Sequence, residues 1–139
     1  GDGPAMTYVT AYITILVVFG VIDAIWLSQM AATLYRPMLG EMMVENVRIL
    51  PAVVFYLFFP AGLMVFAVIP ALRDGSVMSA FAAGALLGAL CYATYDLTNY
   101  ATLKNWTWQI TVIDIVYGAL VAGLCSAAAV YAVQLVHGR

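Results

Sequence analysis

The sequence predicts an all-α membrane protein: four transmembrane helices in a bundle, with a short interfacial helix in the first loop. Composition is the first observation, because 65% of the 139 residues are hydrophobic and 9% are charged, against about 45–50% and about 25% in soluble domains. Length is the second, because about 20 apolar residues in a helix cross the roughly 30 Å of hydrocarbon in a bilayer. The chain holds four such runs and little else, which excludes a soluble catalytic module.

Polar or turn-forming residues delimit each span. We expect the spans at residues 8–30, 49–72, 76–99 and 108–136, all within a single domain at residues 6–139. Residues 1–5 precede Met6 and are interpreted as the remnant of an expression tag. The first span lacks the basic segment of a cleavable signal peptide and is longer than its apolar core of roughly 7–15 residues. We therefore expect a retained helix.

The connections differ in length and polarity. Residues 28–50 form the longest one, in which Glu41, Glu45 and Arg48 share a helical face and predict the interfacial helix. Residues 73–76 include Gly75 and Ser76 and predict a tight turn. Residues 95–108 gather polar, charged and aromatic side chains between two uncharged runs, so this stretch is the predicted hinge of a helical hairpin and the place where chemistry is expected.

Three aspartates converge on one membrane face. The first span ends, the third ends and the fourth begins on that face, which puts Asp23, Asp96 and Asp114 at similar depth. A charged side chain facing lipid costs about 2.5–3.5 kcal/mol on insertion scales, so we expect these acids to face protein or water. The loops on the same face supply three candidate cationic partners, which are Arg36, Arg48 and Lys104. The difference in the number of basic residues between the two membrane faces is too small to set the orientation of the protein in the membrane.

In each of the last two spans, residues spaced four positions apart form a stripe that contains small residues and one aspartate. The two stripes are Gly84, Gly88, Tyr92 and Asp96 in the third span, and Asp114, Gly118, Ala122 and Ser126 in the fourth. Glycine and other small residues allow helix backbones to approach closely in membranes. If the stripes face each other, Asp96 and Asp114 lie at the mouth of one groove.

A short sequence match, or echo, relates the first and fourth spans. Residues 21–26 and 112–117 share Val-Ile-Asp and carry an aromatic residue three positions after the aspartate, Trp26 in one and Tyr117 in the other. The two helices are expected to run in opposite directions. We infer no repeat from so short a match.

Charge and metal-ligand content exclude some partners. The formal net charge is -2 and the five basic residues do not cluster, so we expect no nucleic-acid partner. Cys91 and Cys125 lie in apolar runs, and the one histidine, His137, is expected at the opposite membrane face. We therefore expect no metal site and no cofactor.

Four motifs resemble those of an uncharacterised bacterial integral-membrane family labelled domain of unknown function 2177 (DUF2177). They are Asp23-x-x-Trp26-Leu27, Tyr35-Arg36-x-x-Leu39-Gly40, Tyr95-Asp96-Leu97-Thr98-Asn99-x-Ala101-Thr102-Leu103 followed by Trp106, and Asp114-x-x-Tyr117-Gly118. The resemblance covers essentially Met6 to the C-terminus. It implies a four-helix protein of the bacterial inner, or cytoplasmic, membrane and brings no established activity.

The aspartates and their neighbours form the candidate ligand site. Its members are Asp23, Trp26, Arg36, Tyr92, Tyr95, Asp96, Asn99, Lys104, Trp106 and Asp114. Carboxylates that share a low-dielectric pocket cannot all ionise easily, so such a site can bind a cation, hold a proton or do acid–base work. The aromatic residues can wall a pocket for an organic cation or a lipid headgroup, or form an interfacial belt.

Three classes of function remain open on the sequence. The first is a protein that binds a lipid headgroup or small polar or cationic ligand, or that supports another membrane protein in a larger complex. The second is a small proton-linked transporter, which at four helices would work as a homodimer. The third is a carboxylate-based lipid-modifying enzyme, although the sequence shows no nucleophile–base pair. Asp96 can also serve only to anchor a helix end.

Overall fold

The computed structural model describes residues 3–40 and 48–138, and its regular elements are all helices. In chain order these are α1 (Pro4–Met30), η1 (Ala31–Tyr35), α2 (Arg36–Leu39), α3 (Ile49–Leu63), η3 (Met64–Val68), α4 (Ile69–Asp74), α5 (Val77–Thr102) and α6 (Trp108–His137). They form four continuous segments that are long and apolar enough to cross a membrane: Pro4–Leu39, Ile49–Asp74, Val77–Thr102 and Trp108–His137. The predicted all-α architecture with four spans is confirmed.

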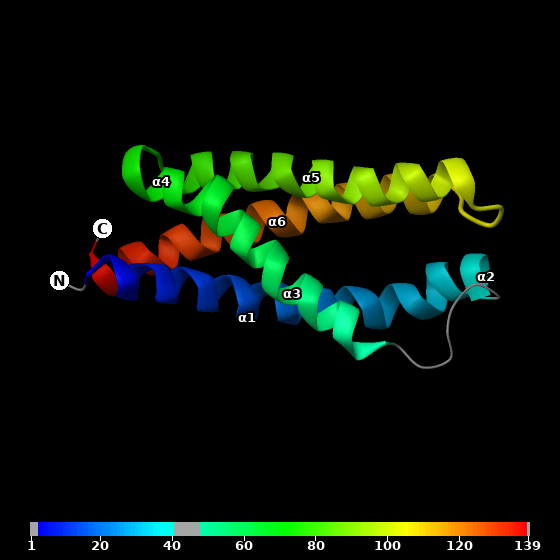
Figure 1. Cartoon of the computed structure of the whole chain (residues 1–139), viewed down its shortest axis with the longest axis horizontal. Coiled ribbons are helices and arrows are strands. Elements are labelled where there is room, and N and C mark those ends of the chain that lie inside the picture. The colour runs from blue at the N-terminus through cyan, green and yellow to red at the C-terminus, as the bar shows by residue number, and fades with distance from the viewer. Residues whose placement is uncertain (1–2, 41–47, 139) are drawn as a thin grey trace.

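The two ends of the bundle carry different connections. Figure 1 shows both termini near the α4–α5 turn at one end, and α2 near the α5–α6 connection at the other. The end of α1, the end of α5 and the start of α6 therefore share one end, as the sequence predicted. The predicted interfacial helix at residues 41–48 lies outside the described residues, except for Arg48, whose backbone is extended at φ -77° and ψ 114°.

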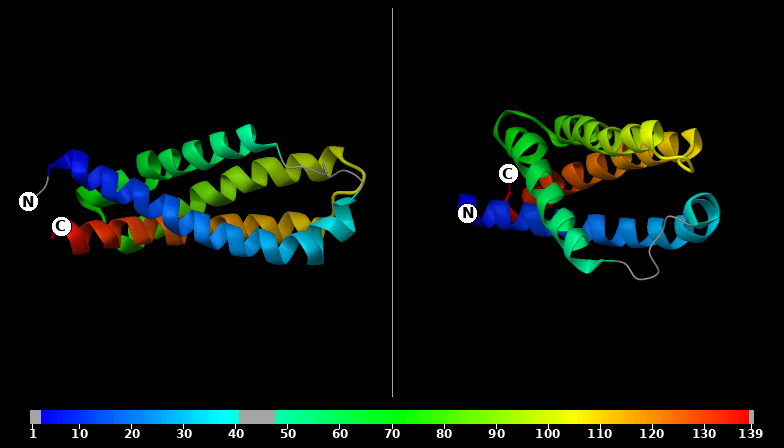
Figure 2. Two further views of the ribbon diagram at one scale, coloured as in Figure 1. Left: turned by 90° about the horizontal axis from the view of Figure 1, so that it is seen from below. Right: turned by 45° about the vertical axis from the view of Figure 1, so that its right-hand side comes forward.

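Helix α6 is the central element of the bundle. It makes the most extensive interhelical contact with α5 and the next most extensive with α1. Helix α3 crosses α1 obliquely, and its C-terminal continuation, η3, packs on α5 and α6 (Figures 1 and 2). Most side chains over residues 49–58 of α3 remain exposed, including Leu50 at 74% and Phe58 at 73%. The bundle is thus closely packed along α5 and α6 and looser beside the start of α3.

The predicted small-residue stripes face each other across the α5–α6 contact. A Cβ atom added at Gly84 would lie 2.7 Å from the carbonyl oxygen of Ala122, and one added at Gly88 would lie 2.6 Å from the Ala122 Cβ. Distances below 3.0 Å leave no room for a side chain, so the two backbones are in close contact. This seam holds the middle of α5 against the middle of α6.

The first span is longer than predicted. We expected a polar connection from residue 28 onward, but the helix continues through η1 and α2 to Leu39. Proline disrupts an α-helix because it lacks an N–H and its ring clashes with the preceding turn. Here the wider π turn of η1 ends two residues before Pro37, and η3 likewise ends two residues before Pro70. The π turns let both helices continue past a proline.

Candidate functional site

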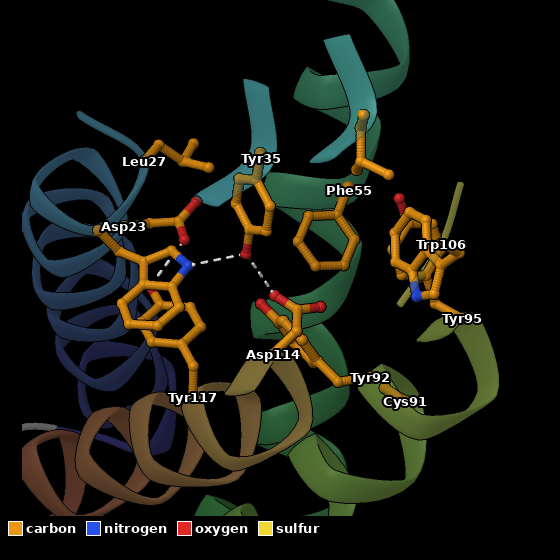
Figure 3. Close-up of a pocket in the computed structure, with 12 residues that line it drawn as sticks. Asp23, Leu27, Tyr35, Phe55, Cys91, Tyr92, Tyr95, Trp106, Asp114 and Tyr117 are labelled. Carbon is orange, nitrogen blue, oxygen red and sulfur yellow. Dashed lines mark hydrogen bonds between the residues drawn. The ribbon is translucent and has the colours of Figure 1, made fainter. Parts of the chain in front are cut away.

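A cavity of about 630 Å³ lies between α1, η1, α3, α5 and α6. Its lining is mostly aromatic and aliphatic, with two carboxylates (Figure 3). The lining residues are Asp23, Trp26, Leu27, Tyr35, Leu39, Phe55, Cys91, Tyr92, Tyr95, Trp106, Asp114 and Tyr117. A volume of this size falls in the range of about 300–1,000 Å³ that small-molecule sites occupy.

Asp23 is held by two tyrosines from other helices. The Tyr117 hydroxyl of α6 donates a hydrogen bond of 2.7 Å to Asp23 Oδ1. The Tyr56 hydroxyl of α3 donates to Asp23 Oδ2. The side chain is 8% exposed, and each of its oxygens has a donor. Asp23 thus joins three helices and is satisfied as a buried acceptor.

An aromatic stack connects Asp23 to the second carboxylate. The Trp26 indole stacks on the Tyr117 ring with centroids 4.0 Å apart and planes 11° apart. The indole N–H of Trp26 donates to the Tyr35 hydroxyl at 3.2 Å, and that hydroxyl donates to Asp114 Oδ1 at 2.8 Å (Figure 3). Tyr35 therefore bridges the end of the first span to α6.

Asp96 lies next to Asp114 but does not line the cavity, and no group in the described part of the chain donates a hydrogen bond to it. It is 0% exposed, and neither of its oxygens has a partner among the described residues. Its carboxyl group lies within hydrogen-bonding reach of the Asp114 carboxyl. Two carboxylates only accept hydrogen bonds, so a bond between them requires a proton on one of the two. The groove predicted at the mouth of the α5–α6 seam is where the two acids meet.

The predicted cationic partners do not reach these acids. Arg36, Arg48 and Lys104 are exposed, and within residues 3–40 and 48–138 no basic side chain contributes to the surroundings of Asp23 or Asp96. Successive residues of a helix point about 100° apart. Because Tyr35 points into the cavity, the adjacent Arg36 points away from it. Within the described residues, these candidate cations therefore do not pair with Asp23 or Asp96.

Trp106 and its neighbours close the cavity toward the loops. The Trp106 indole N–H donates to the Thr111 hydroxyl at 3.2 Å, and its ring meets Tyr95 edge-on at 5.6 Å between centroids. Trp106 also packs in a buried cluster with Leu39 and Ile110. By contrast, Leu27 is 45% exposed and Tyr95 57% exposed on the flank of the bundle. The cavity is thus covered at its loop end and accessible from the side.

The structure brings together most of the predicted site. Six of its residues line the cavity: Asp23, Trp26, Tyr92, Tyr95, Trp106 and Asp114. Asp96 contacts Asp114 from behind, and Asn99 lies beside Tyr95 one helical turn farther along. Arg36 and Lys104 lie outside the cavity. Within the described residues, no group of three or more His, Cys, Asp or Glu side chains is spaced to hold a metal ion.

Three tyrosines of the site were missed. Tyr117 had a signal, since the echo between residues 21–26 and 112–117 placed it like Trp26, and the two rings stack. Tyr35 lay in a segment we expected to be a loop, so its inward position was hidden. Tyr56 reaches Asp23 only because α3 crosses α1. The position of this crossing depends on how the helices pack, which cannot be read from the sequence.

Comparison with curated proteins and with solved structures gives no match. Residues 8–131 do match one family, described as "Predicted membrane protein (DUF2177)". The match covers two of the four spans in full and most of the first and the fourth, including both aspartate–aromatic motifs. The chain therefore belongs to the DUF2177 family of predicted membrane proteins.

Proposed function

We propose that this membrane protein binds an amphiphilic organic cation, meaning a cationic group attached to an apolar body, in the cavity beside Asp114. The observation that carries the proposal is a carboxylate that lies in an aromatic cavity and has no basic partner within residues 3–40 and 48–138. Asp114 accepts one hydrogen bond from Tyr35, and the Asp96 carboxyl lies within hydrogen-bonding reach of it. A cation would supply the countercharge.

The aromatic lining fits the same ligand. Trp26, Tyr92 and Tyr117 form a continuous group, with Tyr92 meeting Tyr117 edge-on at 6.2 Å between centroids. Aromatic faces attract cations by about 0.5–2 kcal/mol each, more when water is excluded. The aliphatic and aromatic remainder of the lining suits an apolar body. The ligand class that best matches both is a lipid headgroup or small molecule bearing one ammonium group.

The accessible side of the cavity supports entry from the bilayer. Leu27, Phe55 and Tyr95 line it, are exposed, and belong to segments long enough to span a membrane. Apolar side chains exposed in such segments face hydrocarbon. An amphiphile dissolved in the bilayer would reach the cavity without crossing the loops. We propose the bacterial inner membrane as its location, and this part rests on the family resemblance.

The test is equilibrium binding of benzyltrimethylammonium to the protein in mild detergent, followed by tryptophan fluorescence or calorimetry. The wild-type protein is expected to bind it, and Asp114→Asn to bind it about ten- to a hundredfold more weakly, because a charged contact worth about 1.5–3 kcal/mol is lost. Asp74→Asn, a matched change at an exposed residue at the other end of the bundle, should have no effect.

Neopentylbenzene provides the ligand control, because it has nearly the same shape and no charge. We expect neopentylbenzene to bind the wild-type protein more weakly than the cation does. Its affinity for Asp114→Asn should equal its affinity for the wild-type protein. Equal binding of the cation by wild type and Asp114→Asn would overturn the proposal, since the carboxylate would then contribute nothing.

A further inference from the structure

We infer that the Asp96–Asp114 pair holds one proton and gives it to an amine that enters the cavity from the bilayer in its uncharged form. The inference rests on the proposed function and narrows its ligand to lipophilic amines. It starts from Asp96, a fully buried carboxyl group whose two oxygens have no donor in the described part of the chain.

The surroundings of the pair hold a proton in place. Among the described residues, the titratable groups that face the Asp96–Asp114 pair are Tyr35 on η1 and Tyr92 and Tyr95 on α5. None of them is basic, and Asp23 beyond them is also an acid. Two adjacent carboxylates in apolar surroundings repel each other and lose the solvation of water, so they share a proton instead of both ionising.

The Asp114 oxygen that does not bind Tyr35 makes the shared proton accessible to a base in the cavity. Tyr35 donates to Oδ1 of Asp114, so its other lone pairs remain for Asp96 and for a ligand. Asp96 is sealed from solvent, whereas Asp114 lines the cavity. A proton shared between the two can therefore move to a base in the cavity through Asp114.

The route of entry selects the uncharged form of the ligand. Carrying an ammonium group through hydrocarbon is costly, whereas the neutral amine partitions readily. Once inside, the amine nitrogen takes the shared proton: the carboxyl O–H bond breaks, an N–H bond forms, and both carboxylates face the new ammonium group. The charge of the site stays the same, and the ligand is held by charge only after it has arrived.

The test compares N,N-dimethylbenzylamine with benzyltrimethylammonium by infrared difference spectroscopy at neutral pH. The two probes differ by one methyl group, and the quaternary ion cannot accept a proton. We expect a protonated-carboxyl C=O band in the ligand-free protein. The amine should abolish it, and the quaternary ion should leave it. Exchange into D2O should shift the band, which identifies a carboxyl group without any mutation.

Asp96→Asn should remove the band in the ligand-free protein, and Asp74→Asn should retain it. A band that persists with bound amine, or that is absent before any ligand is added, would overturn this inference while binding of the quaternary ion still supported the proposed function. If neither probe binds, the proposed function falls and the inference with it.

The pH dependence of affinity is an independent readout. Where the dissolved amine is mostly protonated, its capture releases one proton to solution, so its affinity should rise about tenfold per pH unit. The affinity of the quaternary ion should stay flat over the same range. Identical pH profiles for the two probes would contradict proton transfer in the site.

Discussion

Asp23 and Asp114 occupy similar places in the sequence and different places in the structure. Each precedes an aromatic residue by three positions, and the two rings, Trp26 and Tyr117, stack on each other. Yet Asp23 receives two tyrosine hydroxyls, whereas Asp114 receives one and meets another carboxyl group. The same local sequence pattern thus gives one carboxylate whose two oxygens both accept hydrogen bonds and one that can still accept more. The helices packed against each aspartate determine this difference.

The difference has a structural cause. Helix α3 crosses α1 and brings Tyr56 to Asp23. The glycine seam draws α5 against α6 and brings Asp96 to Asp114. We therefore propose that Asp23 stabilises the scaffold and that the Asp96–Asp114 pair binds the ligand.

Asp23→Leu should have the largest effect on stability. It leaves the hydroxyls of Tyr56 and Tyr117 without their acceptor, and an unsatisfied buried polar group costs about 1–3 kcal/mol. We expect a clearly lower melting temperature in detergent. Asp74→Leu, at an exposed position, is the control and should melt like the wild type. Equal melting of the two variants would remove Asp23 from the scaffold.

Gly88→Leu should come next, at about 1–3 kcal/mol, because a large side chain forces the α5 and α6 backbones apart. Gly20→Leu is the matched control, since a Cβ at Gly20 meets nothing within 4 Å. The separation should also pull Asp96 from Asp114 and weaken cation binding, while the tyrosine bonds to Asp23 remain. Unchanged cation affinity in Gly88→Leu would show that the acid pair does not depend on the seam.

Tyr35→Phe should have the smallest effect on stability, about 1 kcal/mol, because it removes one hydroxyl that donates to Asp114 and accepts from Trp26. The ring still fills the cavity wall. The change should alter tryptophan fluorescence, since the Trp26 N–H loses its acceptor. Tyr100→Phe, on an exposed part of α5, controls for loss of a hydroxyl. An unchanged spectrum would place Trp26 elsewhere in solution.

Much of this arrangement could be predicted from apolar run length and residue spacing. Four runs with alternating direction put Asp23, Asp96 and Asp114 toward one end, and the spacing of Gly84 and Gly88 identified the packed face of α5. These features depend on periodicity within single helices, which the sequence displays directly.

The rest depends on how helices cross and continue. Helix α3 crosses α1 at an angle that only side-chain packing sets, so the Tyr56 contact could not be read from the sequence. The π turn before Pro37 carries the helix past the point where proline and polar residues predicted a loop, and this places Tyr35 inward and Arg36 outward. Of the candidate cationic partners, Arg36 lies outside the cavity for that reason, and Lys104 lies outside it because it belongs to an exposed connection.

The most direct test of the central claim is a thermal shift comparison of wild type, Asp23→Asn and Asp114→Asn, each with and without benzyltrimethylammonium. A ligand at about 100 times its Kd stabilises the folded protein by about 2.7 kcal/mol. The account predicts that wild type shifts upward, that Asp114→Asn melts near wild type but loses the shift, and that Asp23→Asn melts lower but still shifts. A full shift in Asp114→Asn, or a shift lost only in Asp23→Asn, would contradict it.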